Sequence, residues 1–186
     1  MILSVRLFFC VELPDVVRAE LGRVARGLRA RISAGKWVAD ENLHITLRFL
    51  GEVSEEGLPG LRDLGQTVAA GTSPFELRLD RLGAFPSPHR ARVLWAGPTG
   101  ECVPFTDFAR KLEQAVIGLG FPAERREAEP HVTLARLRIP QDVASVVAGA
   151  SRTALHVPVD ALSLMQSELR PQGPLYAPVA RCRLGV

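Results

Sequence analysis

The chain has 186 residues, a length typical of one domain that buries about 70% of its unfolded surface and folds without disulfides or a metal ion. Hydrophobic residues make up 47% and charged residues 23% of the chain, which excludes a disordered, collagen-like or bare coiled-coil protein. The net charge is +3, and arginine supplies nearly all the positive charge because Lys36 and Lys111 are the only lysines. This bias fits an anionic partner and equally fits a genome rich in G and C.

Hydropathy along the chain predicts no membrane segment. The longest stretch without acidic or basic residues, residues 64–75, is shorter than the roughly 18 apolar residues of a membrane-spanning helix. Arg6 and Glu12 interrupt the apolar residues near the start, so we expect no secretory leader and a cytoplasmic location. The three cysteines are far apart and form no C-x-x-C pair, which predicts reduced thiols.

Hydrophobic periodicity predicts alternating strands and helices. A continuous apolar run is typical of a buried strand, apolar residues three or four apart are typical of a helix, and alternation is typical of a half-buried strand. Asp15 is expected to cap the first helix, Gly51 to end an extended segment and Ser54 to open the second helix. In chain order we expect a strand at 2–11, a helix at 16–32, an extended segment at 37–50, a helix at 54–70, strands at 75–82 and 92–96, a helix at 104–119, a strand at 131–137, a short helix at 142–148, and strands at 155–168 and 176–184.

This order predicts an α+β fold. Two strand pairs are joined directly, which favours mainly antiparallel sheets with helices on one face. No linker rich in Gly, Ser or Pro divides residues 1–186. Each half contributes a strand, a helix, a strand pair and one copy of the same tetrapeptide, so we expect two lobes within one domain.

The tetrapeptides carry the strongest signal in the sequence. They read His44-Ile45-Thr46-Leu47 and His131-Val132-Thr133-Leu134, and they hold two of the chain's four histidines. Residues i and i+2 of a strand point to one face, so each copy presents an imidazole and a hydroxyl together. Two such strands side by side would place one histidine to take a proton and another to give one. The hydroxyls could bind an anion, and a phosphodiester fits this arrangement.

Other interpretations of the motifs are weaker. A single copy is most often a core histidine beside a β-branched residue. Neither copy offers a second metal ligand at i+2 or i+4, and no nucleophile elbow or Gly-rich phosphate loop occurs, so we expect no metal and no cofactor. His89 and His156 have no threonine at i+2 and are expected to be structural or on the surface.

A set of segments spread over nearly the whole chain matches the pattern of one known family: Arg6-Leu7-Phe8-Phe9, Leu13-Pro14, Glu41 to Leu47, Phe49 to Val53, Arg92 to Trp95, Pro130 to Arg136, Ser167-Glu168-Leu169, Gly173 and Tyr176. Through these segments the chain resembles the RNA 2',3'-cyclic phosphodiesterases, also called 2'-5' RNA ligases, of the two-histidine (2H) phosphoesterase superfamily. This resemblance implies two pseudo-symmetric lobes with helices outside and an active cleft between them.

The resemblance also implies roles for individual residues. His44 would be the proton donor and His131 the proton acceptor, with Thr46, Thr133 and Arg136 binding the phosphate. Strict alternation instead places Arg48 on the face of His44 and Thr46, and it turns Arg136 away from His131 unless the strand bulges. Both arginines are therefore candidates for the phosphate. Four aromatic residues are candidates for stacking on a base: Phe9, Trp37, Phe49 and Tyr176.

The function implied is hydrolysis of 2',3'-cyclic phosphate ends of RNA to 2'-phosphomonoesters, with 2'-5' joining as the reverse reaction. The expected partner is an RNA end, and we expect a monomer. Two alternatives remain open at this stage. One is an RNA-binding or phosphate-binding module without catalysis, and the other is a 2H enzyme acting on a small cyclic nucleotide or a 2'-5' oligonucleotide.

Overall fold

The computed structural model describes residues 4–150, 154–171 and 173–185. The expected start of the first strand, Ile2, lies outside these residues. The helices are α1 (Asp15–Arg29), α2 (Leu58–Ala70), α3 (Val103–Gly118) and α4 (Ala144–Ala148). The strands are β1 (Ser4–Glu12), β2 (Gly35–Trp37), β3 (His44–Ser54), β4 (Phe75–Leu79), β5 (Arg81–Phe85), β6 (Ala91–Gly97), β7 (Val132–Gln141), β8 (Leu155–Val159), β9 (Ala161–Arg170) and β10 (Gly173–Arg183).

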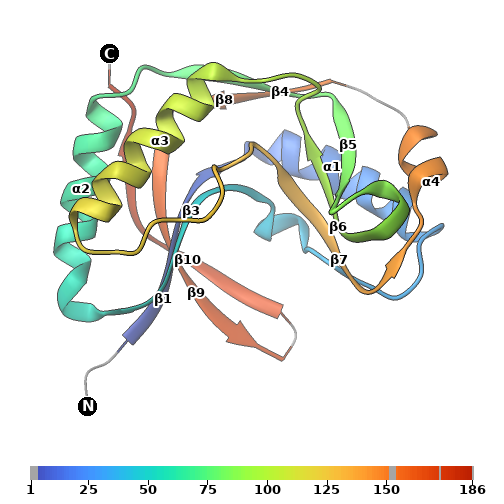
Figure 1. Cartoon of the computed structure of the whole chain (residues 1–186), viewed down its shortest axis with the longest axis horizontal. Helices are drawn as coiled ribbons and strands as arrows, with labels where there is room; N and C mark the ends of the chain where they lie inside the picture. Colours follow the sequence, from blue (N-terminus) through green and yellow to red (C-terminus); the bar gives the residue numbers. More distant parts are fainter. Residues whose placement is uncertain (1–3, 151–153, 172, 186) are drawn as a thin grey trace.

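The fold is α+β, and its strands pair in antiparallel fashion. The larger sheet has 8 strands in the order β10-β9-β1-β3-β7-β6-β5, with β2 paired to β7, and β4 pairs with β8 in a second sheet. In one half of the molecule α2 and α3 lie beside β1, β3, β9 and β10, whereas α1 and α4 lie in the other half with β5, β6 and β7 (Figure 1). The expectation of two pseudo-symmetric halves is confirmed.

The two halves meet at the strands that carry the tetrapeptides. Within the described residues, the register between β3 and β7 consists of one pair, Ile45 with Val132. Both side chains are fully buried. A single paired residue lets the two strands diverge on either side of it, so the halves of the sheet enclose space next to the motifs.

Two segments that the sequence predicts to be single strands are each divided between the two sheets. Residues 75–82 form β4 and the start of β5, and residues 155–168 form β8 and most of β9. The divisions fall at Asp80 and Asp160, whose backbones bond to Gly97 and Leu184. Apolar alternation continues from Val157 and Val159 to Ala161 through the second turn, so the sequence pattern conceals it, whereas at the first turn the alternation ends at Arg81.

Three local expectations are wrong. Pro14, not Asp15, is the N-cap of α1, and the Asp15 carboxylate instead pairs with Arg18. Gly51 does not end its strand. It takes a φ of +74° at an irregularity of the register, and β3 continues beyond it to Ser54 against β1. Ser54 is followed by a 3-10 turn, Glu55–Gly57, before α2 begins.

One hydrophobic cluster spans both halves and positions the site. Its largest fully buried members are Phe9, Phe105 and Phe108, and each such side chain contributes about 1.5–3 kcal/mol of transfer free energy. Ile45 and Val132 belong to the same cluster, so the junction of the tetrapeptide strands is anchored in the core. No helix in the described part of the chain is long and apolar enough to span a membrane.

Candidate active site

The Ile45–Val132 pair brings the two tetrapeptides together. His44 begins β3 and His131 directly precedes β7, so each histidine adjoins this buried pair. Alternation turns the histidine and threonine of each copy to the side opposite the buried residues, where all four side chains are partly accessible. The shared face that the sequence predicts is present.

Both imidazole rings are oriented in the same way. Nδ1 of His44 lies 2.7 Å from the carbonyl oxygen of Asn42, and Nδ1 of His131 lies 2.8 Å from that of Glu129. A carbonyl oxygen only accepts, so Nδ1 carries the proton in each ring and Nε2 is left for chemistry. Nε2 of His44 is 3.1 Å from Oγ1 of Thr46, which donates to it when the ring is neutral.

An aromatic ring flanks each histidine edge-on. Tyr176 meets His44 with ring centroids 5.3 Å apart and an angle of 88°. Phe85 meets His131 at 5.2 Å and 86°. Phe8 also packs against His44, at 4.9 Å. These apolar contacts hold the rings in place and remove part of their hydration.

Partial burial lowers the pKa of both histidines. For His44, burial is the main cause, the Asn42 carbonyl acts in the opposite direction, and the positive charges of His131 and Arg136 lower the pKa further. Burial also lowers the pKa of His131, against the Glu129 carbonyl and carboxylate. The charge of His131 therefore acts on His44, and the two rings line the same cavity.

A bulge in β7 turns Arg136 to the face of His131. The register between β6 and β7 skips Leu134, which is fully buried. Thr133 and Arg136 consequently lie opposite alternate residues of β6 and share a face. The condition for bringing Arg136 to the site is thus met.

A matching bulge in β3 turns Arg48 away. The register between β1 and β3 skips Leu47, so Arg48 lies opposite Phe9 and Phe49 lies opposite Phe8. Phe8 contacts His44, whereas Phe9 faces the core. Strict alternation was therefore the wrong assumption, and Phe49 takes the place on this face that the pattern assigns to Arg48.

The Arg48 guanidinium is 6% exposed and already neutralised. It lies 2.6 Å from Glu113 of α3 and 2.6 Å from Glu124, and it donates to the carbonyl of Phe49 and to that of Pro122. These contacts tie β3 to α3 and to the segment that leads to His131. We therefore propose a structural role for Arg48, which also lines the larger cavity, and we regard Arg136 as the better candidate for the phosphate because it lines both cavities.

Two cavities meet at the paired motifs. One, of about 440 Å³, contains both histidines, and the other, of about 560 Å³, contains His131. They share Thr46, Phe49, His131, Thr133 and Arg136. Of the predicted stacking residues, Trp37 and Tyr176 line the first cavity and Phe49 lines both, but Phe9 is buried in the core and is excluded.

The other histidines lie on the surface, as expected. His89 pairs with Asp142 and His156 with Glu76 in exposed contacts. Asn42, Glu129 and Phe85 were missed by sequence reasoning. The first two stand two residues before a motif histidine, and this common offset is the signal that could have found them.

Comparison with known proteins identifies the family. The family model described as LigT like Phosphoesterase matches residues 11–95 and 102–176. The chain belongs to this family. An RNA 2',3'-cyclic phosphodiesterase of Methanothermobacter thermautotrophicus is 32% identical, covering 98% of this chain and 100% of the relative. One of Aeropyrum pernix is 38% identical, covering 84% and 92%.

Solved structures of LigT-like phosphoesterases share the fold. A crystal structure of Escherichia coli LigT complexed with 3'-AMP has a TM-score of 0.78 at 27% identity, and the match covers 98% of this chain and 99% of that one. The present protein is therefore a phosphoesterase, and its paired motifs belong to the matched part of the chain.

Proposed function

We propose that this phosphoesterase hydrolyses 2',3'-cyclic phosphate ends of RNA to 2'-phosphomonoesters. The observation that carries the proposal is the pair of identically anchored histidines beside one cavity with Thr46, Thr133 and Arg136. The printed activity of the relatives from Methanothermobacter thermautotrophicus and Aeropyrum pernix supports the choice of substrate.

In the proposed reaction, neutral His131 takes a proton from water through Nε2 while the water oxygen attacks phosphorus. The bond from phosphorus to O3' breaks, and protonated His44 gives its Nε2 proton to O3'. The products are a 2'-phosphate and a free 3'-hydroxyl, and the proton gained by His131 balances the one lost by His44. The resemblance to the family sets which histidine acts as the acid.

Charge that develops on the phosphoryl oxygens is stabilised by hydrogen-bond donors already in place. The hydroxyls of Thr46 and Thr133 and the exposed guanidinium of Arg136 face the same cavity. Arginine suits this role because its planar fork can bind two oxygens at once. We propose that these groups act without a metal or other cofactor, and no three potential ligands gather within the described residues.

The same groups can join RNA ends by running the reaction backwards, with a 5'-hydroxyl in place of water. The two cavities that meet at His131 support this second activity, since each could hold one RNA end. The proposal treats residues 1–186 as one bilobal domain, which the hydrophobic cluster shared by both halves supports.

The test is incubation of the purified protein with an oligoribonucleotide that ends in a 2',3'-cyclic phosphate, in excess EDTA. We expect turnover to a 2'-phosphate, which mass spectrometry and resistance to 3'-specific phosphatases identify. His44→Ala and His131→Ala serve as controls and should lower turnover by about 100- to 10,000-fold. Loss of turnover in EDTA that zinc or manganese restores would contradict the metal-free mechanism, and binding without turnover would favour a binding module.

A further inference from the structure

A row of three cations runs along the face of β7 and β2 that carries the site. Lys36 lies directly opposite Arg136 in the register of these strands, and Arg138 follows two residues along β7. Leu137 between them is buried, whereas Lys36, Arg136 and Arg138 are exposed, as alternation requires for a shared face. We call Lys36, Arg136 and Arg138 the cationic row.

The cationic row brings like charges together. Like charges directly opposite each other in a sheet are destabilising, and Lys36 and Arg136 are such a pair. In the described parts of the chain, no carboxylate forms an ion pair with any of the three side chains. An arrangement that costs stability in this way is typical of a functional surface, and three neighbouring cations favour an anionic ligand.

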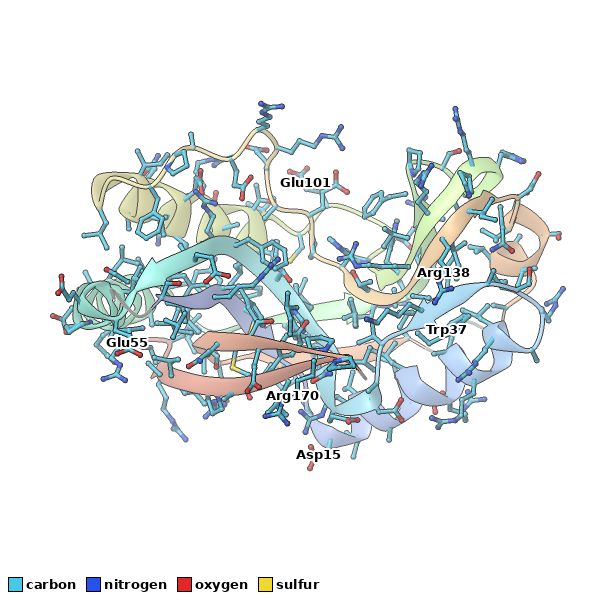
Figure 2. All side chains as sticks on the ribbon, turned by 90° about the horizontal axis from the view of Figure 1, so that it is seen from below. Asp15, Trp37, Glu55, Glu101, Arg138 and Arg170 are labelled. Carbon is cyan, nitrogen blue, oxygen red and sulfur yellow. The ribbon has the colours of Figure 1, made fainter. Side chains whose placement is uncertain are left out.

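The cationic row begins inside the catalytic cavity and leads out of it. Lys36 and Arg136 line the cavity that holds both histidines, together with Trp37 and Tyr176. Arg138 does not line this cavity and extends the row along β7. Figure 2 labels Arg138 on β7 and Trp37 on β2, the strand that pairs with it.

The spacing of the cations along β7 is similar to the spacing of phosphates in single-stranded RNA. Residues two apart on a strand are separated by about 6.6 Å, which is similar to the spacing of successive phosphates in an extended nucleic acid. RNA with a 2',3'-cyclic end continues only from the 5' side of its last nucleoside. An RNA whose cyclic phosphate lies at Arg136 therefore has its remaining phosphates only on the 5' side of that end.

We propose that Lys36 and Arg138 bind the phosphates upstream of the cyclic end, so that the preferred substrate is an oligoribonucleotide and not a mononucleotide. This inference rests on the proposed function and names the substrate class of the same site. A mononucleoside 2',3'-cyclic phosphate reaches the histidines and Arg136 but leaves Arg138 without a partner.

The test compares kcat/KM for a mononucleoside 2',3'-cyclic phosphate with that for a six-nucleotide RNA bearing the same end. We expect the wild type to favour the RNA by at least tenfold. Arg138→Gln should lower this ratio by about 3- to 10-fold with mononucleotide turnover unchanged, and Lys36→Gln should also lower the ratio. In the double variant, the slope of log kcat/KM for the RNA against log salt should become shallower by about 1.4, because each single-strand phosphate contact contributes about 0.7.

Arg62→Gln is the matched control, because Arg62 is an exposed arginine on α2 in the other half of the molecule. It should leave the ratio and the salt slope unchanged. A wild type that turns over both substrates equally well, or variants that leave the ratio unchanged, would overturn the cationic row and leave the proposed function standing. If neither substrate is turned over, the proposed function fails. The cationic row is then tested by binding alone, and the double variant must bind a 3'-phosphorylated hexamer more weakly than the wild type.

Discussion

Phe49 occupies on β3 the position that Arg136 occupies on β7. Each lies three residues after the threonine of its motif, beyond a bulge at a buried leucine, and each lines both cavities. The two motif strands are thus alike in backbone and unlike in chemistry, because one presents an aromatic ring where the other presents a guanidinium. This difference leaves Arg136 as the guanidinium in the lining that both cavities share.

Arg136 should accordingly be sensitive to both charge and shape. We expect Arg136→Gln to lower kcat/KM for a cyclic phosphate by about 100- to 1,000-fold, as loss of a donor to a developing oxyanion does. Arg136→Lys should recover part of this loss because it keeps the charge without the planar fork. Steady-state kinetics checks this, and a glutamine variant within twofold of wild type would rule out a phosphate contact.

The two motif histidines should behave as one unit. Replacing His44 or His131 by alanine should lower kcat by about 100- to 10,000-fold, and the double variant should lose far less than the product of the two effects. Single-turnover kinetics of the four proteins closes this double-mutant cycle. Effects that simply multiply would show that the histidines act separately.

The rate should follow a bell-shaped curve whose optimum for kcat/KM lies below pH 6.5. A lowered pKa keeps the base His131 neutral to lower pH, and it makes the acid His44 lose its proton at lower pH, so both limbs move in the acidic direction. A bound phosphodiester anion favours the imidazolium, so the kcat profile should be displaced to higher pH. Profiles measured from pH 4 to 9 test this. An optimum of kcat/KM well above 7 would contradict the assignment.

The two threonines should differ in one respect. Thr46→Val and Thr133→Val should each lower the rate by about 10- to 1,000-fold because both remove a hydroxyl from the phosphate site. Thr46 also bonds to Nε2 of His44, so its loss should move one limb of the pH profile, whereas the loss of Thr133 should leave both limbs in place. Identical pH profiles for the two variants would show that the Thr46–His44 contact has no influence on catalysis.

Arg48 should matter for stability. Arg48→Ala removes a buried guanidinium and leaves Glu113 and Glu124 without their shared partner. Because both carboxylates are partly exposed, we expect a loss of about 2–4 kcal/mol in the free energy of unfolding, below the range for a fully buried pair. Urea denaturation measures it, and Arg23→Ala, which breaks an exposed pair on α1, should cost less than about 1 kcal/mol. Equal losses in the two variants would contradict the structural role of Arg48.

The sequence by itself determined the elements and the paired motif residues. Periodicity located the helices and most of the strands, and the repeated tetrapeptide located His44, Thr46, His131 and Thr133, because side-chain direction over two residues is a local property of a strand. The tertiary structure decided which arginine joins them. The bulges at Leu47 and Leu134 arise from the register with partner strands distant in sequence, and they reverse the side to which the residues directly after them point. Arg136 therefore shares a face with Thr133 while Arg48 turns toward Glu113 of α3, and Lys36 lines the cavity of both histidines because β2 pairs with β7.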